Sequence, residues 1–374
     1  MKQDKNTGYK ELIKAFDFAE NYRFSYDLPT QSHQINEQAL EKMQLARIHN
    51  SLAITKSLTP QLSIALSNVC NSLHLERDFV SAFVYSSSET QASCFLGDTN
   101  KCNIMISSSL VNLMDDKELE FVLGHELGHF LLKHGENNHT YQTSKEGSML
   151  SRYKEVSSDR IGFIACGSLE SSYSSMIKML SGLSDNYLRY DISALLDQVR
   201  RDSNQTSYLF SYSSHPSLII RIKALLWFSM SKIYKKSISD TDSGDSIEEV
   251  DDQIIKDLDK YIDNPIKKEI NDAKKDLSFW LYIFGMIEDD KFEKKEQQMI
   301  EKKFGIEDLT KVKEIFATKG RDEATDFINQ RLTAAVKNLM QIAPREFELS
   351  FDKKLNSVQQ ELGQKNFISR FKNL

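Results

Sequence analysis

Apolar residues recur at helical spacing through most of this chain, with a short stretch of strand-like pattern before its midpoint. The spacing predicts helices over 9–22, 36–56 and 218–235 and, beyond Pro265, over 266–287, 291–304, 308–318, 321–342 and 345–371. Residues 103–108 predict a strand that carries Ile104 and Ile106 and pairs with residues 93–96 through a turn at Gly97. We therefore expect a predominantly helical α+β protein with a small sheet, followed by a separate all-helical bundle.

The most specific chemistry lies in the run His125-Glu126-Leu127-Gly128-His129. Residues i and i+4 share one face of a helix, so both histidines are placed to bind one Zn²⁺. Bound zinc lowers the pKa of its water from about 15.7 to roughly 7, and Glu126 is placed to accept the proton as that water attacks a carbonyl. The flanking sequence predicts the required helix, from a cap at Asp115 to a stop at Gly135.

A catalytic zinc site normally has three protein ligands and an open fourth position. Glu155 is the best third ligand, on a helix predicted from Ser144 to about Cys166. Asp159 falls on the same face of that helix, where it is placed to accept a hydrogen bond from His125 or His129 and fix the imidazole tautomer. The alternative is that Glu155 and Asp159 are a solvent-exposed acidic pair beside basic residues.

The order of these motifs resembles the gluzincin family that contains HtpX and the CAAX prenyl proteases. HELGH followed by Glu155-x-x-x-Asp159 carries the resemblance, and residues 81–84, 103–108 and 115–122 are similar to the strands and helix start that precede the motif in that family. Ser214-His215-Pro216, followed by Arg221, is similar to the family's His-Pro motif and its later arginine. The resemblance covers residues 65 to 230.

This resemblance implies a zincin-like fold, with the small sheet next to the HExxH helix. It implies one Zn²⁺ held by His125, His129 and Glu155, with Glu126 as general base. It also implies that His215 stabilises the developing oxyanion, with Asp159 and Arg221 supporting the ligands. Taken without the resemblance, a histidine before a proline is typical of a turn.

The composition of the chain limits the classes of partner and the cellular location that we expect for this protein. The longest uncharged apolar run, residues 277–287, is about half the roughly 20 residues that span a bilayer. The start of the chain lacks the apolar region of a secretory signal, so we expect a cytoplasmic enzyme that acts on a polypeptide.

The net charge is −6, and no basic patch points to nucleic acid. The four cysteines lack CxxC spacing and suggest reduced thiols. The alternative is a disulfide between Cys94 and Cys102 across the predicted hairpin, which would require an oxidising compartment. The oligomeric state is not indicated.

The same patterns predict four segments. Residues 1–64 form a helical segment on the peptidase core, 65–236 the metallopeptidase domain, 237–264 an acidic linker and 265–374 the C-terminal helical domain. The last resembles the TerB-like fold of tellurite-resistance proteins, in which an acidic turn precedes a glutamate-rich helix. Here the corresponding acidic residues would either bind a hard cation or cap a helix on a solvated face. They are Glu288, Asp289, Asp290, Glu293 and Glu296.

Three functions follow from this sequence. The first is a zinc endopeptidase whose C-terminal domain regulates it or recruits its substrate. The second is a catalytically latent or inactive zinc-binding scaffold. The third is an envelope-stress or toxic-anion response adaptor in which the helical domain carries the function.

Overall fold

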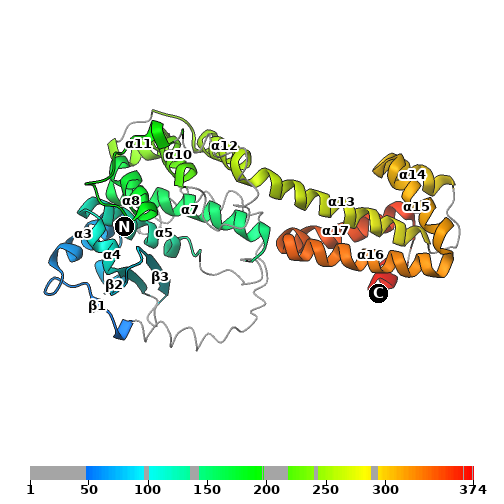
Figure 1. The fold of residues 1–374 in the computed structure, drawn as a ribbon, viewed down its shortest axis with the longest axis horizontal. Coiled ribbons are helices and arrows are strands. Elements are labelled where there is room, and N and C mark those ends of the chain that lie inside the picture. Colours follow the sequence, from blue (N-terminus) through cyan, green and yellow to red (C-terminus); the bar gives the residue numbers. More distant parts are fainter. Residues whose placement is uncertain are drawn as a thin grey trace, which may run out of the picture. The chain divides into compact units, whose positions relative to one another are not determined.

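The computed structural model describes residues 48–96, 101–134, 143–195, 197, 218–239, 243–287, 294–364, 366–372 and 374. The chain divides into two compact units, one formed by residues 1–139 and 148–262 and the other by residues 140–147 and 263–374 (Figure 1). Each unit has its own apolar core. The expected fold class is confirmed, because helices dominate and the strands form one small sheet.

The sheet has the strand order β1-β2-β4-β3. Its strands are β1 (Leu52–Ala53), β2 (Val80–Tyr85), β3 (Ala92–Leu96) and β4 (Cys102–Ser107). β2 and β4 are parallel, and β3 pairs antiparallel with β4, which confirms the predicted pairing. The helix predicted over 36–56 is wrong at its described end, because β1 pairs with β2 there and so satisfies its backbone groups in the sheet.

Helix α5 (Asp116–Leu131) carries the HExxH sequence. As predicted, Asp115 caps it: the Asp115 carboxylate accepts from the Glu118 amide (2.8 Å), and the Glu118 carboxylate accepts from the Asp115 amide (2.8 Å). The helix ends at Leu131, earlier than predicted, because Lys133 adopts a left-handed φ of 55° and turns the chain. The predicted stop, Gly135, lies outside the described residues.

Helix α7 (Lys145–Cys166) runs where the sequence predicts it and ends before Gly167, which has a φ of 65°. Glycines bring α5 and α7 into backbone contact. A Cβ on Gly124 would lie 2.4 Å from the Cβ of Ala165, and one on Gly162 would lie 2.7 Å from the Phe121 carbonyl oxygen. Because the two helices approach this closely, side chains from both of them can meet at one point.

Further helices among the described residues of the first unit pack around its core. They are α3 (Pro60–Ser72), α4 (Ser108–Leu113), α8 (Leu169–Ser181), α10 (Leu218–Ser229), α11 (Lys232–Ser239) and α12 (Ile247–Leu258), with a 3₁₀ turn, η2 (Arg77–Phe79). The helix predicted over 218–235 is interrupted between α10 and α11, where Ser231 bridges to Asp245.

Part of the predicted acidic linker is folded. Residues 247–258 form α12, whose Val250, Ile254 and Leu258 are buried at helical spacing. Two of its acidic side chains form ion pairs within the first unit: Asp251 binds buried Arg160 (2.5 Å), and Asp257 binds Lys223 (2.6 Å). The acidic composition of this segment is typical of a linker, whereas its apolar positions every four residues indicate a helix.

The second unit is a helical bundle. Its helices are α13 (Asn264–Met286), α14 (Lys294–Phe304), α15 (Ile306–Lys319), α16 (Arg321–Ile342), α17 (Pro344–Leu362) and α18 (Phe367–Lys372), after a π-helical turn, η3 (Asp259–Asp263). In Figure 1, α13, α16 and α17 run side by side, and α13 packs on both of the others. The predicted helices are confirmed, except that Gly363 (φ 72°) divides the last one into α17 and α18.

The first turn of α7 belongs to this second unit. Its Glu146 carboxylate accepts from the backbone amides of Arg345 (2.9 Å) and Glu346 (3.3 Å), at the start of α17. A carboxylate in that position satisfies amides that have no partner within the helix and interacts favourably with the helix dipole. Within the described part of the chain, none of the helices is apolar over a stretch that would cross a bilayer.

Candidate metal centre

Three predicted ligands meet at the seam between α5 and α7. The Nε2 atoms of His125 and His129 are 3.1 Å apart. One oxygen of Glu155 lies 3.3 Å from the Nε2 atom of His129, and the other lies 3.6 Å from the Nε2 atom of His125. Donor atoms bound tetrahedrally to one Zn²⁺ at about 2.0–2.1 Å would be separated by roughly 3.3 Å. The geometry and chemistry of these donors therefore fit a zinc ion.

The ligands lie in a largely buried environment. His125 and Glu155 are buried and His129 is half-buried. Burial alone would raise the pKa of the Glu155 carboxyl, but the hydrogen bond to His129 and the charge of Arg221 outweigh it and hold this pKa well below its usual value. Glu155 is therefore an ionised oxygen donor. The alternative of a solvated acidic pair is excluded, because Glu155 and Asp159 are both buried.

Asp159 and Arg221 lie behind the ligands. Asp159 lies 2.9 Å from the Nδ1 atom of His125 and accepts a hydrogen bond from it, so in the neutral imidazole the proton sits on Nδ1 and Nε2 is the atom that can bind a metal. Arg221, on α10, donates to both oxygens of Asp159 (2.8 and 2.6 Å) and approaches Glu155 (3.5 Å). Burial would raise the pKa of Asp159, but the Arg221 charge outweighs it and keeps this pKa low. The carboxylate therefore stays ionised where it orients His125.

These positions can be compared with known proteins. Residues 57–145 match peptidase family M48. The M48 match runs from just before α3 to the start of α7, so it includes His125, Glu126 and His129 and stops before Glu155. It supports a zinc metallopeptidase of the M48 family for this part of the chain. Neither a curated protein nor a solved structure gave a significant match.

His134 lies beside the second nitrogen of His129 in the M48-like segment. Its Nδ1 atom is 3.0 Å from the Nδ1 atom of His129 and 3.3 Å from the hydroxyl oxygen of Ser158. Lys154 donates to the His134 carbonyl oxygen (2.8 Å). The sequence did not point to Ser158 or Lys154. The sequence marks these two residues only by their positions, because Lys154 directly precedes Glu155 and Ser158 directly precedes Asp159 on α7.

Glu126 lies on α5 between the two histidines and is 9% exposed. The thiol of Cys94, on β3, lies against it. Hydrogen bonding to Cys102, burial and the nearby Glu126 carboxylate raise the pKa of the Cys94 thiol, so this group is protonated. All four cysteines are free.

Several predicted site residues cannot be placed. His215, the predicted oxyanion donor, lies outside the described residues, as do Glu288, Asp289, Asp290 and Glu293 of the acidic turn. Glu296 is described and lies in the first turn of α14.

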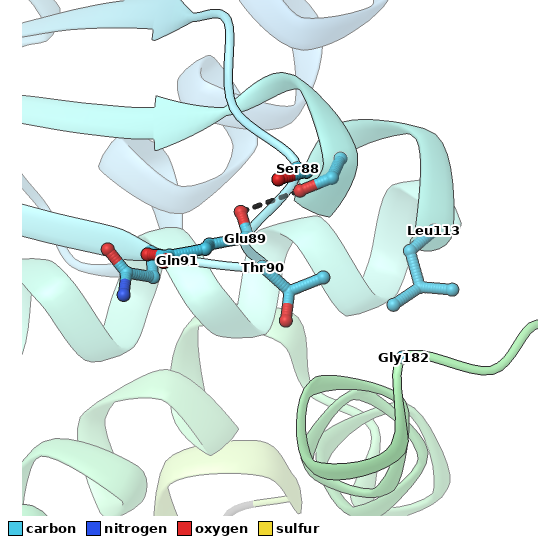
Figure 2. A pocket seen from close by; sticks show the side chains of 7 residues that line it. Ser88, Glu89, Thr90, Gln91, Leu113 and Gly182 are labelled. Carbon is cyan, nitrogen blue, oxygen red and sulfur yellow. Dashed lines mark hydrogen bonds between the residues drawn. The ribbon is translucent and has the colours of Figure 1, made fainter.

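The first unit also contains a hollow. It has a volume of about 410 Å³ and is lined by Ser88, Glu89, Thr90, Gln91, Ser109, Leu113 and Gly182 (Figure 2). The Ser109 hydroxyl donates to the Glu89 carbonyl oxygen beside it (2.6 Å). None of its lining residues is a histidine or a cysteine, so it shares no ligand with the metal centre.

Proposed function

We propose that this protein is a zinc endopeptidase that binds its metal through His125, His129 and Glu155. The observation that carries the proposal is the convergence of these three donors, within 4.8 Å of one another, at a buried seam. The M48 match supports the same reaction class for the segment that supplies both histidines. The similarity to HtpX and the CAAX prenyl proteases, taken from the motif order, belongs to this proposal.

Zinc at this site would lower the pKa of a water molecule and polarise the substrate carbonyl. Glu126 then takes the proton of the attacking water and delivers it to the leaving amine. Asp159 keeps His125 in the tautomer that binds metal, and Arg221 holds Asp159. His215 is proposed to donate to the developing oxyanion.

The sheet offers a way to position the substrate. β3 pairs with β4 on one side and with no described strand on the other, and β3 packs on α5. A peptide that added to the open edge of β3 would use main-chain hydrogen bonds for its affinity and would present its backbone beside Glu126. We propose this edge as the substrate-binding strand.

The direct test is the rate at which zinc-loaded protein cleaves a neutral, unfolded polypeptide. Replacing Glu126 with Gln keeps the size of the side chain and removes the base, and we expect the rate to fall by about 10²- to 10⁴-fold. Glu170→Gln is the matched control, because Glu170 is exposed on α8 and outside the site. If Glu126→Gln cleaved as fast as the wild type, the proposal would fail.

A latent zinc protein is the second candidate, and the position of Cys94 favours it. The Cys94 thiol contacts the Glu126 carboxylate, the group that has to accept the proton of the attacking water. The latent state predicts that Cys94→Ala cleaves faster than the wild type. An active resting enzyme predicts no increase, so the same cleavage assay separates the two candidates.

A further inference from the structure

The C-terminal unit contains a large pocket that the peptidase chemistry does not use. Its volume is about 1170 Å³, and helices α13 to α17 supply all of its lining residues. Sites for small molecules usually have volumes of roughly 300–1,000 Å³. The pocket is therefore larger than a typical small-molecule site.

The lining is strongly cationic. Seven of the lining residues are lysine or arginine and two are aspartate. Both aspartates are engaged within the unit, since Asp276 accepts from the indole of Trp280 (3.0 Å) and Asp308 pairs with Lys311 (2.9 Å). The basic residues come from each of the five helices rather than from one, so the positive charge is spread along the pocket.

Lys354, on α17, is the clearest uncompensated charge. It is half-buried, its ammonium group lies 5.6 Å from the centre of the Tyr282 ring, and it forms no ion pair with any described residue. The neighbouring Lys303 pairs with Glu361, and Lys274 pairs with Glu346 (2.5 Å). Burial, followed by the charge of Lys303, lowers the pKa of Lys354. A cation held in this position gains stability when an anion binds beside it.

Aromatic side chains line the same pocket. Phe279 contacts Trp280 and Phe304, with ring centroids 5.0 and 5.3 Å apart, and Phe351 contributes from α17. Arg331 stacks on Trp280 at 5.4 Å. A complementary ligand thus carries acidic groups together with apolar ones.

We propose that this pocket binds an extended, acidic polypeptide segment with interspersed aromatic residues, and so recruits acidic proteins to the peptidase. Successive side chains on one face of an extended peptide are about 6.6–6.8 Å apart, which suits cations spread along a pocket. A single phosphate group would instead need several donors that converge on one point. The recruiting role rests on the proposed peptidase function, whereas the binding of the peptide does not.

The test uses the full chain carrying Glu126→Gln, so that the probe is not cleaved. The probe is a fluorescein-labelled hexapeptide, Glu-Phe-Glu-Glu-Phe-Glu, blocked at both ends and followed by fluorescence anisotropy. We expect saturable binding that weakens as salt is added. Lys354→Glu should weaken it by at least about tenfold, because a charged contact is lost and a repulsion is added. Lys337→Glu, on the exposed face of α16 and outside the pocket, should change it by less than about twofold.

Three results would overturn the inference. One is equal binding of the matched Gln-Phe-Gln-Gln-Phe-Gln peptide, which would show that acidity is not recognised. Another is unchanged affinity in both Lys354→Glu and Lys354→Gln proteins that unfold at the wild-type temperature. The third is binding of ATP, or of vesicles containing phosphatidylserine, that depends on Lys354 while the peptide does not bind. Because this assay needs no cleavage and the cleavage assay uses a neutral substrate, each proposal can fail while the other stands.

Discussion

Asp159 connects His125 to Arg221 through one fully buried carboxylate, and its replacement by Asn tests whether that contact supports the metal. Asp159 accepts hydrogen bonds at 2.9 Å from His125 and at 2.8 and 2.6 Å from Arg221. Asn has the same size, but it carries no charge and one of its two oxygens becomes a donor. The variant therefore keeps the packing, but it removes the charge and leaves one acceptor oxygen to serve both His125 and Arg221.

The expected loss of zinc affinity follows from that contact. Removing the carboxylate partner of a metal-binding histidine typically costs about 10- to 100-fold in affinity, or about 1.4–2.7 kcal/mol. The free energy of unfolding should also fall, because Arg221 loses its close ionic partner and keeps only the longer ion pair with Glu155 (3.5 Å). Breaking a buried pair costs about 3–5 kcal/mol, and we expect the lower end because the Arg221 side chain remains 16% exposed.

The assay is a zinc titration against a competing chelator, with urea unfolding of the same samples. Asp257→Asn is the matched control. Asp257 lies on α12, binds Lys223 at 2.6 Å and contacts none of the proposed metal ligands. We expect Asp257→Asn to bind zinc as the wild type does. If Asp159→Asn also bound zinc with wild-type affinity while remaining folded, the supporting role of the carboxylate would be refuted.

Three further predictions concern the same seam. His134→Ala should weaken zinc binding by about tenfold in the same titration, because His129 loses the partner of its second nitrogen; no change would remove His134 from the account. Gly124→Ala should lower the free energy of unfolding in urea by about 1–3 kcal/mol, and adding Ala165→Gly should recover part of the loss by removing the 2.4 Å contact. A failed rescue would show that α5 and α7 are not held at this contact. Free zinc at 100 times its dissociation constant should stabilise the wild type by about 2.7 kcal/mol in a thermal melt and leave His129→Ala unaffected. An equal response in both proteins would place the ion elsewhere.

The sequence predicted the parts of the fold that depend on local rules. The Asp115 cap, the end of α7 before Gly167 and the pairing of residues 93–96 with 103–108 follow from capping chemistry and side-chain periodicity, and all three are present. The early end of α5 was not predictable, because it depends on a left-handed Lys133, a residue type that seldom adopts that conformation. The helix within the acidic linker was missed because composition was given more weight than the spacing of its three buried residues.

The candidate site shows a similar division. HExxH spacing places His125 and His129 on one face by helix geometry alone, whereas Glu155 is 26 positions further along, on another helix. The need for a third ligand and the predicted helix over 144–166 pointed to Glu155, the resemblance implied the same residue, and the glycine-mediated approach of α5 and α7 explains how it reaches the histidines. Contacts such as Ser158 to His134 depend on how the two helices are rotated and stacked, which periodicity does not specify. The same is true of the pocket in the second unit, which five helices build together.

We propose that one zinc ion binds between α5 and α7. The measurement that tests it most directly is an anomalous difference map at the zinc absorption edge, from crystals of zinc-loaded protein. We predict one peak at about 2.0–2.2 Å from the Nε2 atoms of His125 and His129 and from a carboxylate oxygen of Glu155, with a fourth position open. A peak bound elsewhere, or no peak at this seam in the presence of excess zinc, would contradict the account.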